Sequence, residues 1–165
     1  MFIMFIINRV NMTVKRLIQK FYYKIIFGNK VLFGDNFRSR GKFSLFIDKN
    51  GSIIFGKNVF LNNDFSANSQ NKIEIGDNCI FGENVKMYDH NHIFVDKNAP
   101  ISEQGFNTDP IKIGKNCWIG SNVTILKGVQ VGDNCVIGAN CLIYKDIPSN
   151  SVVKLKEQLS ISERK

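Results

Sequence analysis

A six-residue repeat runs through most of the chain and constrains its fold more than any other feature. Each copy reads aliphatic residue or Phe, Gly, any residue, Asn, small or apolar residue, any residue. In-frame copies begin at Phe33, Phe55, Ile75, Phe81, Ile113, Ile119, Val131 and Ile137. Self-similarity at such a short fixed period is the signature of a solenoid, in which each repeat packs on its neighbours.

Each part of the repeat has a physical role in a solenoid. The apolar residue opens a short strand and points inward, whereas Gly and Asn most readily take positive φ and so suit tight corners. One repeat makes a strand and a turn, and three repeats make one coil of a triangular prism. Stacked coils then bury a continuous core. The sequence predicts an all-β domain at residues 31–153, a single-stranded left-handed parallel β-helix of hexapeptide repeats.

The repeat also explains the four cysteines of the chain. They occupy the fifth position of their hexads, where valine stands in other copies: Cys79, Cys117, Cys135 and Cys141. A zinc site needs converging ligands at a spacing such as C-x₂-C, which these residues lack. We therefore expect small core residues, a free thiol at each, and no metal.

Residues 1–30 precede the repeat and contain a helical pattern. Over residues 12–27 apolar side chains recur at helical spacing, at Val14, Leu17, Ile18, Phe21, Tyr22 and Ile25, and Gly28 gives a stop signal. We expect a short amphipathic α-helix whose apolar face covers the open first coil, because solenoids need terminal caps. Residues 154–165 are expected to form a short polar tail.

The charge of this chain is concentrated near its start. The formal net charge is +8, and no acidic residue precedes Asp35, whereas the helical segment carries Lys15, Arg16, Lys20 and Lys24. This balance is compatible with peripheral contact with an anionic membrane and gives little support to nucleic-acid binding. The opening MFIMFII is shorter than the roughly 20 residues of a membrane span. We therefore expect neither an anchor nor a signal peptide, and a cytoplasmic protein at most peripheral to the inner face of the membrane.

The period breaks between Met87 and Ile113, and both histidines of the chain lie at the start of the break. His90 and His92 precede an expected extended loop at residues 93–110. Interruptions of a solenoid are natural places for a functional site. A smaller irregularity, at residues 61–72, contains Asn62, Asn63 and Asp64, which we expect to lie beside this loop. From the residues alone, the histidines are either catalytic or ordinary polar loop residues.

The repeat, the broken coil with its histidines, and the stretches CWIGSNVTILKGVQVG and VIGANCLIYKDIPSNSVV together resemble the hexapeptide-repeat acyltransferases. They are most similar to the maltose, galactoside and polysaccharide O-acetyltransferases. The resemblance covers residues 31–153 and implies a homotrimer with active sites between subunits. It also implies acetyl-CoA as acetyl donor, no metal, and a saccharide acceptor in capsule, O-antigen or other surface polysaccharide biosynthesis.

Mapped onto this chain, the resemblance assigns roles to individual residues. The catalytic histidine of the sugar branch falls sixteen residues after Gly76, at His92, and His90 remains a second candidate. Trp118, Ser121, Ala139 and Lys145 match cofactor-binding positions, and Asn62 matches a polar residue of the acceptor pocket. The family's Gly-Asn-Pro-Ala turn after "SVV" is replaced here by KLKEQL. Lys154 and Lys156 are candidates for the basic charge near the adenosine phosphate.

Three other functions were weighed against O-acetyl transfer. An amino-sugar N-acetyltransferase is the nearest rival, since the residues do not distinguish an amine from a hydroxyl acceptor. A non-catalytic β-helix scaffold would not need the combined set of histidine and cofactor residues. The zinc-dependent carbonic anhydrases that share this helix use three histidines, whereas this chain has two. A histidine general base suits acetyl transfer to a hydroxyl, because imidazole titrates near neutral pH.

Overall fold

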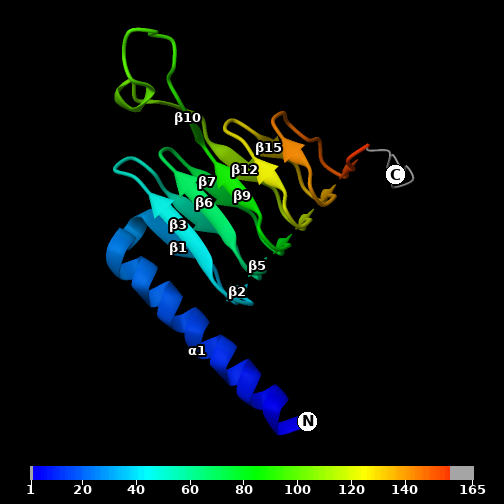
Figure 1. Ribbon diagram of the computed structural model, residues 1–165. Coiled ribbons are helices and arrows are strands. Elements are labelled where there is room, and N and C mark those ends of the chain that lie inside the picture. Colours follow the sequence, from blue (N-terminus) through cyan, green and yellow to red (C-terminus); the bar gives the residue numbers. More distant parts are fainter. Residues whose placement is uncertain (1, 157–165) are drawn as a thin grey trace, which may run out of the picture.

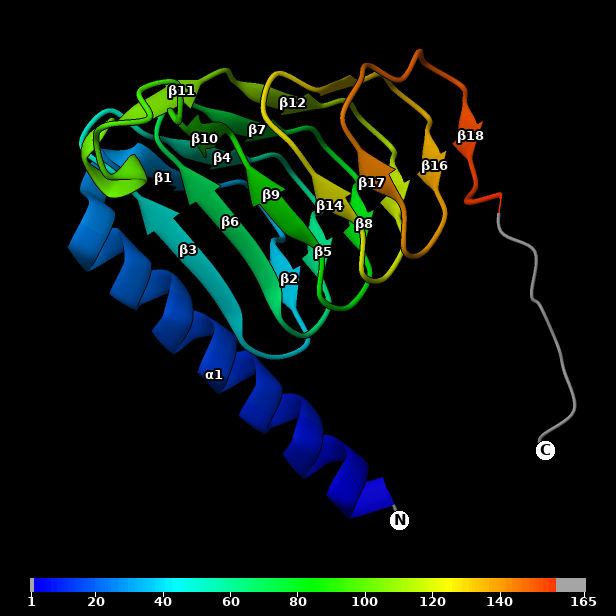
Figure 2. The same cartoon turned by 45° about the horizontal axis from the view of Figure 1, so that its top comes forward.

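The chain folds as a triangular prism of parallel strands with a long helix across one end (Figure 1). The computed structural model describes the backbone of residues 2–156 and the side chains of residues 13–156. Within those residues three parallel sheets form the faces of the prism, and the predicted left-handed parallel β-helix is confirmed. Figure 2 shows the coils stacked from β1, next to the helix, to β18 at the other end.

Each coil contributes one strand to each face of the prism. Sheet A contains β1 (Val31–Phe33), β4 (Ile53–Phe55), β7 (Ile73–Ile75), β12 (Ile111–Ile113) and β15 (Gln130–Val131). Sheet B contains β2 (Arg38–Ser39), β5 (Phe60–Leu61), β8 (Ile80–Phe81), β13 (Trp118–Ile119), β16 (Val136–Ile137) and β18 (Val152–Val153). Sheet C contains β3 (Phe43–Ile47), β6 (Phe65–Ser69), β9 (Lys86–Tyr88), β14 (Thr124–Ile125) and β17 (Leu142–Ile143).

The inward-pointing residues of the strands form one core along the prism axis. Except for Phe33 in the first coil, which is partly buried, the apolar residues that open the hexads are buried, as the repeat predicts; Ile75, Phe81 and Ile119 are each at most 1% exposed. The cysteines at the fifth position are also buried and unpaired. The thiols of Cys79, Cys117 and Cys135 contact the next coil, and the Cys79 Sγ lies 3.1 Å from the carbonyl oxygen of Gly114. The Cys117 thiol and burial raise the pKa of Cys79, so it stays a neutral core residue.

Gly and Asn have different roles at the corners, which corrects the expectation that both take positive φ. The asparagines do so: Asn84, Asn122 and Asn140 have φ of 55°, 59° and 62°. Gly120 is needed instead for close approach, because a Cβ there would lie 2.6 Å from the backbone nitrogen of Ala139 in the next coil. The asparagine side chains also stack, with Asn122 Nδ2 donating to Asn140 Oδ1 at 3.1 Å.

The N-terminal helix α1 (Phe2–Phe27) is longer than predicted and faces the other way. It is followed by the short 3-10 helix η1 (Gly28–Lys30). The expected capping residues point away from the prism, and Phe21 is 69% exposed. Tyr23 is buried instead: its hydroxyl donates to the Phe43 carbonyl at 3.0 Å and accepts from the Leu45 amide at 3.2 Å. These two hydrogen bonds fix which side of the helix meets the first coil.

The inward side of α1 is partly polar, which a search for apolar periodicity does not detect. The Lys20 ammonium lies 5.5 Å from the centroid of the Phe33 ring and 5.8 Å from that of Phe37, so its charge is held by aromatic faces. Burial and the charge of Arg16 lower the pKa of Lys20. Tyr23 stacks on Phe27, with ring centroids 6.1 Å apart. Over the described residues, no helix is long and apolar enough to cross a membrane.

The break in the repeat is an antiparallel hairpin that projects from the corner between sheets C and A (Figure 1). Its strands are β10 (His90–His92) and β11 (Phe106–Thr108), with the 3-10 helix η2 (Ile101–Glu103) between them. The expected loop at residues 93–110 is thus the outer part of this hairpin and its second strand. The coil resumes in register afterwards, since Ile111 pairs with Ile73. The predicted tail falls mostly at residues 157–165, outside the described part of the chain.

Candidate active site

The most strongly organised polar group of the hairpin region is the buried carboxylate of Asp89. Its side chain has no solvent exposure and accepts a hydrogen bond from the Ser69 hydroxyl at 2.7 Å. The backbone amides of Gln70 and Asn71 donate to it at 2.8 and 2.9 Å. All of these groups come from the end of β6, one coil below. A buried charge is tolerated only with such a set of donors, so the corner is built around this carboxylate.

The remaining contact of Asp89 fixes the ring of His90. Nδ1 of His90 lies 3.0 Å from Asp89 Oδ1, and the His90 side chain is 15% exposed. Since an ionised carboxylate only accepts, Nδ1 must carry the hydrogen, and Nε2 is then an acceptor when the imidazole is neutral. The ring of Phe106 packs edge-on against His90 at a centroid distance of 5.2 Å. His90 thus has the tautomer and the fixed orientation that a general base needs.

His92 lies two residues further along β10 and is held less firmly. It is exposed and faces Phe106 across the hairpin, with ring centroids 4.4 Å apart and the planes inclined at 43°. The structure therefore places both histidines around one phenylalanine ring. Only His90, of the two, has a carboxylate that orients its imidazole among the described contacts. This contact is our reason for considering His90, the second candidate of the sequence analysis, before His92.

A groove on sheet B brings together three of the predicted cofactor residues. It has a volume of about 380 Å³ and is lined by Trp118, Ser121 and Ala139, together with backbone of Gly82, Gly120 and Gly138. The stacked glycines leave one side of the groove free of side chains, and Val136 and Val152 add apolar surface beside Trp118. Ser121 Oγ accepts from the Glu83 amide at 3.1 Å and keeps its own hydrogen for donation. Trp118 is 57% exposed and offers a flat apolar wall.

Lys145 does not line this groove but the next one. It follows β17 and lies with Leu142, Tyr144 and Leu155 around a hollow of about 180 Å³. The two hollows share Val153 and Lys154. Lys154 is therefore the lysine that lines the groove of Trp118.

Asn62 is separated from the histidines within one chain, contrary to expectation. It lies at the corner between sheets B and C, where its backbone N–H donates to the Phe81 carbonyl at 3.0 Å. The histidines lie at the other end of sheet C. The residues beside them are Ser69 and Asn71, because β6 runs the length of the face between the two corners. Neither histidine is among the residues that line the groove of Trp118.

Asp89 and Phe106 are the site residues that the sequence reading missed. A signal for Asp89 was present: side chains alternate along β9, so two residues after the buried Met87 a side chain again points inward. An aspartate at an inward position, directly before a histidine, indicates a buried carboxylate that can orient that histidine. Phe106 had no comparable signal, because its position opposite His92 depends on the register of the hairpin. Among the described residues no cluster of three or more His, Cys, Asp or Glu side chains is placed to hold a metal ion.

Comparisons with known proteins agree with the repeat and the fold. Residues 110–145 match the family model described as the hexapeptide repeat of succinyl-transferase. A maltose O-acetyltransferase from Clostridium difficile 630 superposes with a TM-score of 0.61 at 34% identity, over 75% of this chain and 65% of its own. A galactoside acetyltransferase in complex with coenzyme A gives 0.60 at 32% identity, over 74% of this chain and 59% of its own.

A third structure was solved with the acetyl donor. It is a hexapeptide-repeat-containing acetyltransferase from Vibrio cholerae O1 biovar eltor complexed with acetyl-coenzyme A, with a TM-score of 0.65 at 26% identity over 73% of this chain. The match spans 64% of that protein, so the chain covers slightly less than two thirds of these three structures. No curated protein sequence matches the chain.

Proposed function

The chain belongs to the hexapeptide-repeat acyltransferase family, and from this premise we propose that it is an acetyl-CoA-dependent O-acetyltransferase. The acceptor is a hydroxyl group of a saccharide. The maltose and galactoside enzymes among the similar structures support this substrate class, and the acetyl-coenzyme A complex supports the donor. Capsule, O-antigen or another surface polysaccharide is the product pathway that we infer, with the reaction on the cytoplasmic side, where acetyl-CoA is available.

The observation that carries the proposal is the hydrogen bond between Asp89 and His90. With Nδ1 donating to the carboxylate, Nε2 of His90 takes the proton of the acceptor hydroxyl as its oxygen attacks the acetyl carbonyl. The buried carboxylate stabilises the imidazolium that forms. His90 then returns the proton to the departing sulfur, so that one C–O bond forms and one C–S bond breaks. A positioned base of this kind contributes roughly 10²–10⁴ in rate.

The groove on sheet B fits an extended cofactor arm. Glycine backbone forms one side of the groove, Trp118 provides an apolar wall, and Ser121 provides a hydroxyl donor. Acetyl-CoA supplies the activated acetyl thioester when bound. Lys154 at one end of the groove, and Lys145 in the adjoining hollow, are the cations we assign to the phosphates of coenzyme A.

We further propose that the working molecule is a homotrimer. Within one chain the groove and Asn62 lie at the edge of sheet C opposite to His90. Acyl donor and base can meet only if a neighbouring subunit brings its own corner of histidines to the groove. In that arrangement Asn62 comes close enough to a partner's His90 to contact the acceptor, which would restore the role that the family resemblance gives it.

An acceptor screen with purified protein and acetyl-labelled acetyl-CoA tests the proposal. We expect label on a saccharide, with one free thiol released for each acetyl transferred. Treatment with hydroxylamine then distinguishes the products, because it removes an ester-linked acetyl group and leaves an amide. Hydroxylamine-stable label would move the function to amino-sugar N-acetylation. Titration calorimetry that finds no affinity for coenzyme A would contradict enzymatic acetyl transfer altogether.

A further inference from the structure

The helix α1 presents a broad apolar face to the solvent. Its outward residues are between 47% and 69% exposed: Val14, Leu17, Ile18, Phe21, Tyr22, Ile25 and Ile26. Tyr23 and Phe27 lie on the opposite side, against the first coil. At about 100° per residue, the apolar face is therefore centred directly away from the prism. An apolar surface of this size marks an interaction site rather than ordinary surface.

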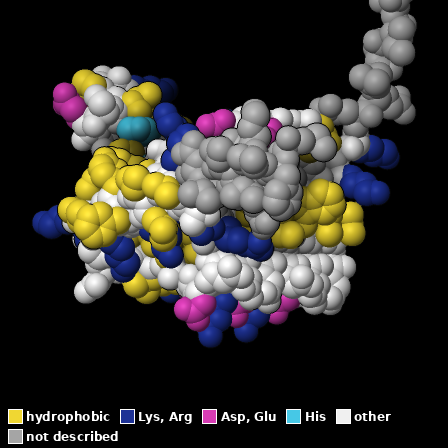
Figure 3. Space-filling model, turned by 90° about the horizontal axis from the view of Figure 1, so that it is seen from below, with side chains coloured by type: hydrophobic (Ala, Val, Ile, Leu, Met, Phe, Trp, Pro, Cys, Tyr) yellow, Lys and Arg dark blue, Asp and Glu magenta, His cyan; other side chains and the backbone are white. Residues whose placement is uncertain are grey.

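The charged residues of α1 itself are all of one sign. No Asp or Glu occurs before Asp35, while six basic residues do: Arg9, Lys15, Arg16, Lys20, Lys24 and Lys30. On the helical wheel Lys15 and Lys24 fall at the two borders of the apolar face, one on each side. Figure 3 shows hydrophobic side chains interspersed with Lys and Arg on the face seen from below. This is the distribution of a helix that lies in a membrane surface, with basic side chains at its flanks.

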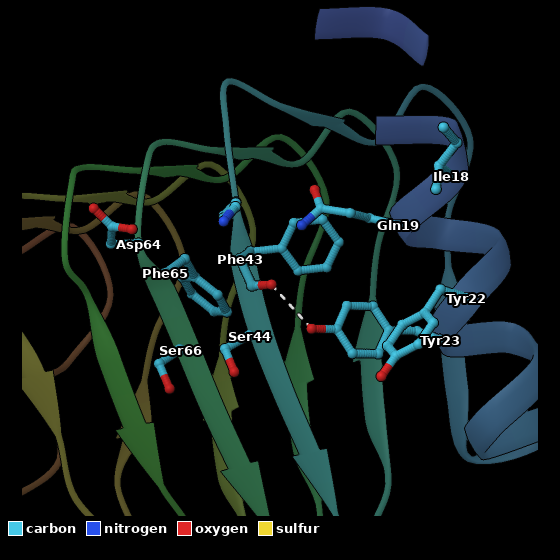
Figure 4. A pocket seen from close by; sticks show the side chains of 10 residues that line it. Ile18, Gln19, Tyr22, Tyr23, Phe43, Ser44, Asp64, Phe65 and Ser66 are labelled. Carbon is cyan, nitrogen blue, oxygen red and sulfur yellow. Dashed lines mark hydrogen bonds between the residues drawn. The ribbon is translucent and has the colours of Figure 1, made fainter. Parts of the chain in front are cut away.

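A groove beside α1 enlarges the apolar surface. It has a volume of about 770 Å³ and lies between the helix and the beginnings of β3 and β6 (Figure 4). Ile18 and Tyr22 of the outward face form one wall, and the outward Ser44 and Ser66 lie across from them, over the buried rings of Phe43 and Phe65. Lys42 and Asp64 at its rim balance each other in charge. The helix and the groove together offer one continuous surface on the same end of the prism.

The charge pattern decides between a membrane and a second copy of the chain. Two copies joined through this face would bring the basic flanks of both helices together with no acidic partner on either helix. An anionic lipid surface complements both the basic flanks and the apolar face of α1, since headgroups pair with the lysines while acyl chains cover the apolar residues. An amphipathic helix with basic flanks lies parallel to such a surface, with its apolar face toward the acyl chains.

We propose that α1 anchors the protein peripherally to anionic membranes by inserting its outward apolar face between the headgroups. This differs from a purely electrostatic contact, because the apolar side chains contribute directly to binding. It does not depend on the proposed acetyl transfer, and it places the first coil of the prism against the bilayer. An enzyme held in this way meets acceptors that are carried on lipids.

Co-sedimentation with phosphatidylcholine vesicles, with and without phosphatidylglycerol, tests the anchor. We expect binding only to the anionic vesicles, and at least roughly a tenfold loss of binding in a Leu17→Ser, Phe21→Ser, Ile25→Ser variant. Lys15→Gln and Lys24→Gln should each lower binding about fivefold at low salt. The matched control is Phe46→Ser with Leu142→Ser, two exposed apolar residues on the prism, which should bind as the parent does.

Light scattering and a fluorescence measurement separate the alternatives. The serine variant should keep the oligomeric state of the parent, since a lipid surface and not a subunit covers the face. As an independent readout, Phe21→Trp should show emission quenched by brominated lipid, beyond that of Trp118, the single tryptophan of the chain. Absence of quenching would overturn the anchor. A parent protein that does not bind vesicles, together with a triple serine variant that dissociates into smaller species, would also overturn it and assign the face to a second copy.

Discussion

The coils of the prism and the helix α1 are both amphipathic, yet they direct their apolar residues in opposite ways. In the coils Phe81 has no exposed surface, whereas Phe21 on the helix is 69% exposed. A strand in the prism is hydrogen-bonded to coils on both sides, so the direction of every side chain is set by its neighbours. The helix satisfies its backbone internally and can rotate freely until a few specific contacts, such as those of Tyr23, fix it. Hydrophobic periodicity therefore predicts which residues are buried only where neighbouring strands also fix the direction of the side chains.

The largest expected effect is the difference between truncating a buried phenylalanine in the prism and truncating an exposed phenylalanine on the helix. Phe81→Ala should cost about 3–5 kcal/mol in the free energy of unfolding, because it leaves a cavity in the core. Phe21→Ala on the helix and Phe46→Ala on the outside of β3 should each stay within about 0.5 kcal/mol. Urea denaturation of the three variants measures the difference. If Phe21→Ala costs as much as Phe81→Ala, the helix face is covered within the folded protein and the contrast fails.

The second expected effect concerns the hairpin corner, where the repeat is interrupted by a buried charge. Asp89→Asn replaces an acceptor oxygen by an NH₂ group that faces existing donors, including the Ser69 hydroxyl and the Asn71 amide. We expect a loss of about 1–3 kcal/mol in stability. We also expect at least roughly a tenfold fall in kcat, because the orientation of His90 is lost.

A matched substitution at another corner serves as the control for Asp89. Asp64→Asn changes the same functional group at an exposed position with a φ of 60°, which asparagine tolerates well. Its stability and its kcat should remain close to those of the parent. Equal losses in both variants would mean that Asp89 acts only through general charge and not through its contacts.

The smallest expected effect tests the corner asparagines of the regular coils. Asn122→Ala should destabilise the protein by about 1–2 kcal/mol, since alanine is strained at a φ of 59° and the side-chain ladder is interrupted. Asn122→Gly should cost less, because glycine takes positive φ without strain. Thermal unfolding compares the two. A glycine variant that is the less stable would show that the side-chain ladder, and not the backbone conformation, selects asparagine here.

The regular part of the fold was predictable from the sequence because each hexad repeats one local solution. The inward residues, the buried cysteines and the resumption of the coil at Ile111 all follow from the period. The facing of α1 was not predictable, since its inward side contains Lys20 held by two aromatic rings. The full length of α1 also differs from the prediction, which begins the helix at residue 12.

The candidate site was predictable in composition more than in arrangement. Trp118, Ser121 and Ala139 share a groove because Ser121 and Ala139 occupy equivalent corners of successive coils, while Trp118 lies three residues before Ser121 in the same coil. The order of the histidines depends on a hydrogen bond that sequence spacing does not reveal, namely that of His90 with Asp89. Asn62 and the histidines lie at opposite ends of the five-residue strand β6. The hexad pattern predicts shorter strands and so does not reveal this separation.

The acetyl-transfer rate of His90→Gln beside that of His92→Gln is the most direct test of the account. Both variants are made on the same strand and assayed with the best acceptor at saturating acetyl-CoA. We predict that His90→Gln lowers kcat at least roughly a hundredfold while coenzyme A affinity is retained, because only the base is removed. His92→Gln should lower kcat by only a few-fold. Full activity in His90→Gln together with an inactive His92→Gln would contradict the assignment of the base to the histidine that Asp89 holds.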